Sequence, residues 1–112
     1  MPEFTDCYRL VTFAPPEAVR ELAKCVSALI PARDDYDHVA WWSAEGTEQF
    51  RPLPGSNPTR GDVGEITRAP SVRIEFTLPK DDALLEKLIT DGIQKHHPWE
   101  KPVILVFGHR LY

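Results

Sequence analysis

The sequence contains no long apolar run and no excess of positive charge. No uninterrupted apolar segment approaches the ~20 residues that a helix needs to cross a bilayer. The formal net charge of −4 argues against a nucleic-acid-binding surface, which is usually basic. The first residues also lack the positive-then-apolar pattern of a secretion signal. We therefore expect a cytoplasmic protein whose partners include neither a membrane nor a nucleic acid.

Cysteine and the common catalytic motifs are scarce as well. Two cysteines, Cys7 and Cys25, are too few for a disulfide scaffold, and we expect both to be reduced. None of the four histidines forms the H-x-x-x-H spacing of a zinc site, and the adjacent pair His96 and His97 cannot face one ion from a regular element. No G-x-S-x-G or P-loop pattern is present. We therefore assign no cofactor, no metal and no catalytic residue.

Glycine is sparse, with six residues, whereas proline is abundant, with eleven. The prolines stand at the ends of predicted elements, where they stop a helix or set the start of a strand. A chain of 112 residues has the length of one domain. We place a single domain over residues 1–112.

Four segments have the composition or alternation of strands. They cover residues 8–13, 36–43, 72–78 and 103–107. The third is the clearest, because its apolar residues alternate with Arg73, Glu75 and Thr77. In the second, Trp41 and Trp42 point to opposite sides, so either Trp42 lies under a loop or another subunit covers it.

Two segments have the three- and four-residue apolar spacing of amphipathic helices. The first begins near Pro16 and ends before Pro31, and the second begins at a cap formed by Asp81 or Asp82. Gly92 in the second is expected to mark a frayed last turn. Between the second and third strands, residues 45–47 predict a turn, 48–52 a hairpin arm, 53–64 a loop, 65–68 a short edge piece and 69–71 a turn.

The order of these elements predicts an α+β fold, a ferredoxin-like βαββαβ sandwich with an extra β-hairpin after the second strand. Both helices are expected on one face of an antiparallel sheet, with the second and last strands at its edges. These edge strands carry more apolar side chains than an exposed edge usually does. We therefore expect identical subunits to cover the open face.

Several sequence segments, in the same order, resemble a known family. They are YRLVTFAP at 8–15, YDH at 36–38, EGTEQFRP at 45–52, GDVGE at 61–65, VRIE at 72–75 and HPWEKP at 97–102. Through them the chain resembles the PII-like insert domain of the YqfO (NGG-interacting-factor-like) proteins and, more distantly, the CutA and PII proteins. The tryptophan pair and the doubled histidine depart from the family pattern.

This resemblance implies a ferredoxin-like, CutA/PII-like domain that assembles through its open sheet face, often as a trimer, with a sensory or regulatory role. The longer family members bind two metal ions through flanking halves, so that metal site is not transferred here. The chain looks like a stand-alone version of the insert.

Five polar residues are candidates for ligand binding: Arg51, Arg73, Glu75, His97 and Glu100. The Arg73–Glu75 pair is interpreted either as an interface ion pair or as the floor of an anion pocket between subunits. His97 is expected to hydrogen-bond the backbone at the helix end, with a metal or catalytic role as the alternative.

Seven residues are candidates for the interface between subunits: Trp41, Trp42, Phe50, Pro52, Val103, Leu105 and Phe107. The segment 50–52 is interpreted either as a hairpin tip that reaches a neighbouring subunit or as a ligand-facing loop.

The sequence is compatible with three functions. The favoured one is a non-enzymatic homo-oligomer, with a trimer preferred, that binds a small-molecule effector or a protein partner at subunit clefts. The first alternative is a CutA-like divalent-metal-binding protein, based on the histidines and cysteines. The last is an enzyme whose site combines His97, Glu100 and Arg73 from adjacent subunits.

Overall fold

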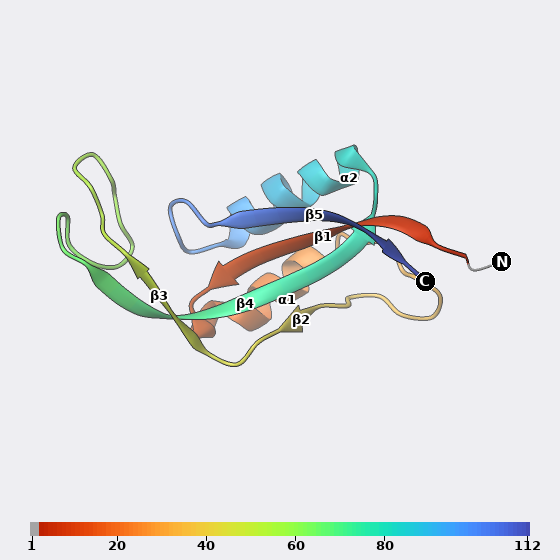
Figure 1. The fold of residues 1–112 in the computed structure, drawn as a ribbon, viewed down its shortest axis with the longest axis horizontal. Helices are drawn as coiled ribbons and strands as arrows, with labels where there is room; N and C mark the ends of the chain where they lie inside the picture. The colour runs from red at the N-terminus through yellow and green to blue at the C-terminus, as the bar shows by residue number, and fades with distance from the viewer. Residues whose placement is uncertain (1–2) are drawn as a thin grey trace.

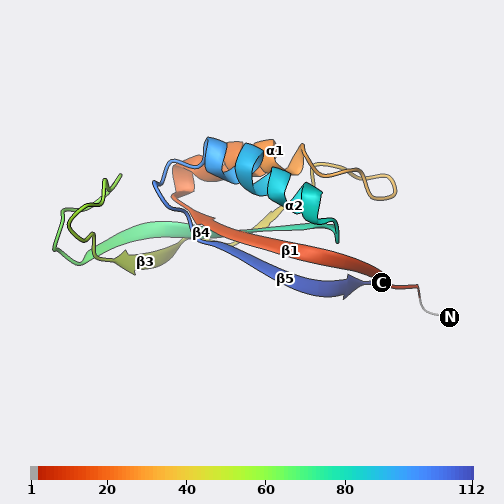
Figure 2. The same ribbon diagram turned by 90° about the horizontal axis from the view of Figure 1, so that it is seen from above.

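The computed structural model describes residues 3–112, and within them a five-stranded antiparallel sheet carries both helical segments on one face (Figures 1 and 2). The strands are β1 (Thr5–Ala14), β2 (Trp41–Trp42), β3 (Gly46–Phe50), β4 (Thr67–Pro79) and β5 (Ile104–Leu111). The helices are η1 (Pro16–Ala18), α1 (Val19–Ser27), α2 (Asp82–Lys87) and η2 (Leu88–Gln94).

The strand order is β2-β4-β1-β5, with β3 also paired to β4. This topology confirms the predicted ferredoxin-like α+β fold with an extra hairpin. It also confirms that the second and last strands lie at the edges of the sheet. The pairing of β1 with β5 places Thr5 opposite Leu111. The start of β1 and the end of β5 therefore lie side by side (Figure 1).

The core lies between the helices and one face of the sheet. Alternate residues of β4 point into it, and Ile74, Phe76 and Leu78 are at most 2% exposed. Leu22 and Val26 of α1 pack against this row. Full burial of such a side chain stabilises the fold by about 1.5–3 kcal/mol, which explains why the alternating segment forms the most regular strand.

The helices begin where the sequence predicts. Pro16 occupies the first turn before α1, where the missing N–H is no loss. The Asp81 carboxylate accepts a hydrogen bond from the Leu84 N–H and caps α2. The second helical segment continues as the π-helix η2.

The interpretation of Gly92 as a frayed turn is wrong. Gly92 is buried in η2, and a Cβ atom added to it would lie 3.1 Å from Cγ2 of Val26. The glycine therefore permits the close approach of η2 to α1.

Two strand predictions also differ from the structure. The predicted strand 36–43 is reduced to Trp41–Trp42, because the backbone reverses before it, with Arg33 bridged to Tyr36 and left-handed φ values at Asp34 and His38. Within the predicted edge piece 65–68 and turn 69–71, residues 67–71 instead belong to β4, which is continuous over Thr67–Pro79, whereas Glu65 and Ile66 precede it.

β3 and the first half of β4 form an arm that extends beyond the end of β1 (Figure 1). The molecule is accordingly elongated, with extents of 55 × 27 × 23 Å. The arm and its loop lie at the opposite end of the molecule from the start of β1 and the end of β5 (Figure 1).

Candidate functional site

The face of the sheet opposite the helices is open (Figure 2). Strand register places Trp41 beside Glu75, Glu75 beside Val11, and Val11 beside Leu105, so these four form one row across that face. Phe107 lies in the neighbouring row, opposite Arg9. The large apolar side chains at the two ends of the rows are exposed: Trp41 by 56%, Leu105 by 37% and Phe107 by 46%.

A charged cluster occupies the middle of the open face. One oxygen of the Glu75 carboxylate lies 3.1 Å from Nε of Arg73, and the other lies 3.5 Å from Nη1 of Arg9. The Glu75 side chain is 19% exposed, whereas both arginines are more than 40% exposed. The cluster therefore presents two guanidinium groups that share one carboxylate.

A cavity of about 300 Å³ lies where the open face meets the arm. Phe13, Arg73 and Val103 line it from the sheet, and Thr47 and Glu48 line it from β3. The Ser71 hydroxyl donates to the Glu48 carboxylate. Arg73 thus belongs both to the ion pair and to the wall of a cavity, and its two interpretations between subunits stay predictions.

A second cavity, of about 290 Å³, lies between the hairpin loop and the segment before β5. The hairpin loop is residues 51–66, between β3 and β4, and the segment before β5 is residues 95–103. The cavity lining includes Phe50, Arg60, Trp99 and Lys101, together with Val103 and Glu48, which the two cavities share. The cavities therefore adjoin each other along the inner side of the arm.

Three polar contacts connect the hairpin loop to other parts of the chain. The Asn57 N–H donates to the Glu100 carboxylate at 3.0 Å, and the Thr59 hydroxyl donates to the Pro98 carbonyl at 3.0 Å. Arg60 forms an ion pair with Glu17 at 2.8 Å. The first two contacts hold the loop against the segment before β5, the ion pair holds it against η1, and together they shape the second cavity.

His97 has a structural position, as the backbone-bonding interpretation predicts. The Trp99 N–H donates to its Nδ1 at 3.0 Å, which leaves the proton on Nε2. Nε2 in turn donates to the Phe13 carbonyl oxygen at 2.6 Å. Burial lowers the pKa of His97, although the bond to Phe13 and the nearby Glu48 carboxylate oppose the shift. Both ring nitrogens are thus engaged within the chain, and neither faces a ligand.

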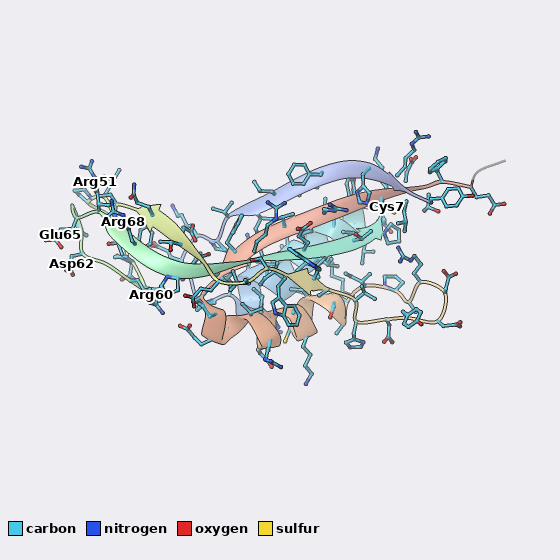
Figure 3. All side chains as sticks on the ribbon, turned by 60° about the horizontal axis from the view of Figure 1, so that its bottom comes forward. Cys7, Arg51, Arg60, Asp62, Glu65 and Arg68 are labelled. Carbon is cyan, nitrogen blue, oxygen red and sulfur yellow. The ribbon has the colours of Figure 1, made fainter. Side chains whose placement is uncertain are left out.

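The five predicted ligand residues do not form one cluster. Arg73 and Glu75 meet on the open face, Glu100 lines the second cavity, and His97 is buried beneath it. Arg51 is exposed at the far end of the arm, near Glu65 and Arg68 (Figure 3).

The predicted interface residues are also divided. Trp41, Leu105 and Phe107 lie on the open face, and Val103 lies beside it at the cavities. Trp42 instead pairs in register with the core residue Ile74 and therefore lies on the helix side, where it is 43% exposed. Pro52 is buried in its own chain and lines the second cavity. Phe50 is half-buried and lines the second cavity.

The sequence interpretation missed Glu48, Trp99 and Lys101 as site residues. Trp99 and Lys101 belong to the HPWEKP segment, where an aromatic residue and a cation flank a carboxylate. That composition is a usable signal, whereas Glu48 carries none, because it lies in an unbroken run of polar residues, Thr47–Gln49.

Residues 3–112 contain no group of three His, Cys, Asp or Glu side chains that could hold a metal ion. Cys7 is buried at the end of the sheet near the termini (Figure 3), and it pairs in register with His109.

No helix among the described residues has the length and apolar character needed to cross a membrane.

Comparison with known proteins identifies relatives over nearly the whole chain, although no family model matches. The chain is 31% identical over 102 residues to a GTP cyclohydrolase 1 type 2 homolog from Bacillus subtilis, a match that covers 89% of this chain. The protein of the same name from Staphylococcus aureus is 29% identical over 96 residues, or 86% of this chain. The chain spans only about a quarter of the length of these relatives, 26% and 25% respectively.

Solved structures agree with this match. A Bacillus cereus protein related to NIF3 superposes with a TM-score of 0.75 and 26% identity, covering 96% of this chain and 27% of that protein. The divalent ion tolerance protein CutA1 from Ehrlichia chaffeensis has a TM-score of 0.66 and 18% identity, covering 94% of this chain and 82% of its own. GlnK from B. subtilis has a TM-score of 0.51 and 10% identity, covering 94% and 86%. The last two show the fold alone. The chain is thus related to one segment of the YqfO-like and NIF3-related proteins and has the fold shared by CutA1 and GlnK.

Proposed function

We propose that the chain acts in the cytoplasm as a non-enzymatic homo-oligomeric module, with three copies favoured, that binds a small effector or a protein partner at clefts between subunits. The observation that carries this proposal is the row across the open face. It ends in exposed large apolar side chains, Trp41 on β2 and Leu105 on β5.

A second copy of the chain is the occupant that this face suits. Leu105 and Phe107 stand next to each other along the edge strand β5, which pairs only with β1 within the described chain. Covering such side chains stabilises an assembly by up to about 1.5–3 kcal/mol each. The adjacent Arg9–Glu75–Arg73 cluster contains both signs of charge, so it can offer opposite charges to a neighbouring copy.

The resemblance to the PII-like insert domain favours three copies. In a cyclic assembly, the β5 edge of each subunit meets the open sheet face of the next subunit, and the copies close into a ring. In such a ring the cavities at the arm border the interface, because Val103 lines both of them and immediately precedes β5. Subunit clefts are therefore the proposed places for an effector.

We propose no cyclohydrolase activity for this chain, although the relatives carry that name. The match covers about a quarter of those proteins, and the polar residues brought together here are committed to ion pairs and backbone hydrogen bonds.

Light scattering coupled to size exclusion at micromolar concentration tests the assembly. We expect the mass of a trimer for the unmodified chain and a shift toward monomer for Leu105→Glu and Phe107→Glu. Val63→Glu is the matched control, because Val63 is an equally exposed apolar residue, at 49%, in the hairpin loop. A monomer for the unmodified chain, or dissociation by the control variant alone, contradicts the proposal.

A further inference from the structure

We infer that the cavity between the hairpin loop and the segment before β5 binds a flat aromatic molecule that carries a single carboxylate group. This inference rests on the proposed function, since it names the chemical class of the effector.

The walls of this cavity suit a flat apolar ring. Phe50 comes from the end of β3 and Trp99 from the segment before β5, and Pro52 and Pro58 of the loop complete the apolar lining. Aromatic side chains favour stacked or edge-on contacts with a ligand ring. A volume of about 290 Å³ lies at the lower end of the ~300–1,000 Å³ typical of ligand pockets, so a molecule of one or two rings fits better than a larger one.

The charges of the lining favour a single negative charge on the ligand. Glu100 already accepts the Asn57 N–H, and Arg60 is already paired with Glu17. Lys101 is exposed at the cavity and has no carboxylate partner within 4 Å among residues 3–112. Its ammonium group is therefore the cation left to pair with a ligand carboxylate.

The same lining disfavours a polyphosphate. The carboxylates of Glu48 and Glu100 belong to the wall, so each additional negative charge on a ligand meets like charge. The loop glycines Gly55, Gly61 and Gly64 do not have the G-x-x-x-x-G-K-[ST] spacing of a phosphate-binding P-loop. A monoanion is held by Lys101 without this penalty.

The cavity is largely formed before any ligand enters. The Asn57–Glu100 and Thr59–Pro98 hydrogen bonds and the Arg60–Glu17 ion pair connect the loop to the rest of the domain. A preformed site loses less conformational freedom on binding than a mobile loop does.

Titration of the full-length chain by NMR tests the inference, with 2-naphthoate, the neutral 2-naphthalenemethanol and ATP as probes. The reporters are the Trp99 indole N–H, assigned with Trp99→Phe, and the Asn57 backbone N–H. We expect both to shift with 2-naphthoate. The alcohol should bind about fivefold more weakly, because an exposed ion pair contributes up to about 1 kcal/mol.

Lys101→Ala should bring the affinity for 2-naphthoate down to that for the alcohol. Lys95→Ala, an exposed lysine at the end of the helix, is the matched control and should leave it unchanged. Equal binding of acid and alcohol, preference for ATP, or no shift at the two reporters up to millimolar probe overturns the inference.

Light scattering on the same samples separates this inference from the assembly. A trimer that fails to bind 2-naphthoate contradicts the cavity inference alone, whereas a monomer that binds it at Trp99 contradicts the proposed assembly alone.

Discussion

Nε2 of His97 lies 2.6 Å from the carbonyl oxygen of Phe13 and connects the end of the second helix to the end of β1. The same imidazole accepts the Trp99 N–H through Nδ1. One neutral side chain thus fixes the start of the segment that lines the second cavity. These two contacts explain why His97 is buried within the chain.

We predict that His97→Ala lowers the free energy of unfolding by about 1–3 kcal/mol, because the Phe13 carbonyl, in a part-buried position, loses its partner. Urea unfolding followed by circular dichroism measures this loss. His96→Ala is the matched control, since the neighbouring histidine is exposed and should change stability little. Equal losses for the two variants would argue against the hydrogen-bonded role of His97.

The stability of the protein should also fall in mild acid because of His97. Burial holds its pKa in the folded chain below the ordinary value, which is about 6.5, so the unfolded chain takes up the proton first. The stabilising contribution is therefore complete above about pH 6.5 and decreases as the pH falls below it. Unfolding measured between pH 8 and pH 5 should show a smaller decrease for His97→Gln than for the unmodified chain. Identical pH profiles would refute this assignment.

Gly92→Ala should destabilise the fold, although alanine is the better helix former by about 1 kcal/mol. The new Cβ would lie 3.1 Å from Cγ2 and 3.5 Å from the Cα atom of the fully buried Val26, and such overpacking costs about 1–3 kcal/mol. The measurement is a double-mutant cycle with Val26→Ala, which removes the crowding methyl groups. We expect the two changes together to cost less than the sum of their separate costs. Strict additivity would show that the contact does not limit this position.

Glu75→Gln should weaken the association of subunits more than it weakens the fold. The change leaves Arg73 and Arg9 without a shared carboxylate, and because both are well exposed, the fold loses under about 1 kcal/mol. In the assembly, the same two cations would face the neighbouring copy unneutralised. Sedimentation equilibrium should show weaker association at low salt and partial recovery at high salt, as screening reduces the repulsion. An unchanged association constant would remove the cluster from the proposed interface.

Glu100→Ala should release the hairpin loop. The Asn57 N–H loses its acceptor, so hydrogen exchange of residues 56–59 should become faster while exchange in β4 stays slow. Glu65→Ala is the matched control, because this exposed carboxylate lies in the same loop. If the loop exchanges at the same rate in all three proteins, the contact does not hold it.

The regular part of the fold could be predicted because local pattern and tertiary contacts agree there. In β4, Val72, Ile74, Phe76 and Leu78 alternate with polar residues and are indeed the buried face. The strand predicted at residues 36–43 failed because composition alone does not produce pairing. Tyr36 and Val39 suit strands but are 74% and 58% exposed, in a segment bent by left-handed residues.

The turn predicted at residues 69–71 rested on Pro70 and is wrong. β4 runs through this residue, which pairs with Thr47 of β3. β1 has ended at Ala14, opposite Val72, so the described strands give β4 a partner on one side only at Pro70. A strand tolerates a proline at such an unpaired edge.

The second cavity could not be predicted from local sequence. Its walls come from segments about forty residues apart, which are joined by the bonds of Asn57 to Glu100 and of Thr59 to Pro98. Neither segment has a helical or strand period, so nothing in the pattern indicates that they meet.

The placement of Thr5 opposite Leu111 has a practical consequence for handling this domain. A polypeptide fused at either end emerges from one corner of the molecule, opposite the arm and its two cavities (Figure 1). The domain can therefore be grafted into a surface loop of a carrier protein, or labelled with a fluorophore, with the arm left clear. A short spacer of a few residues suffices, since entry and exit points are neighbouring strands about 5 Å apart.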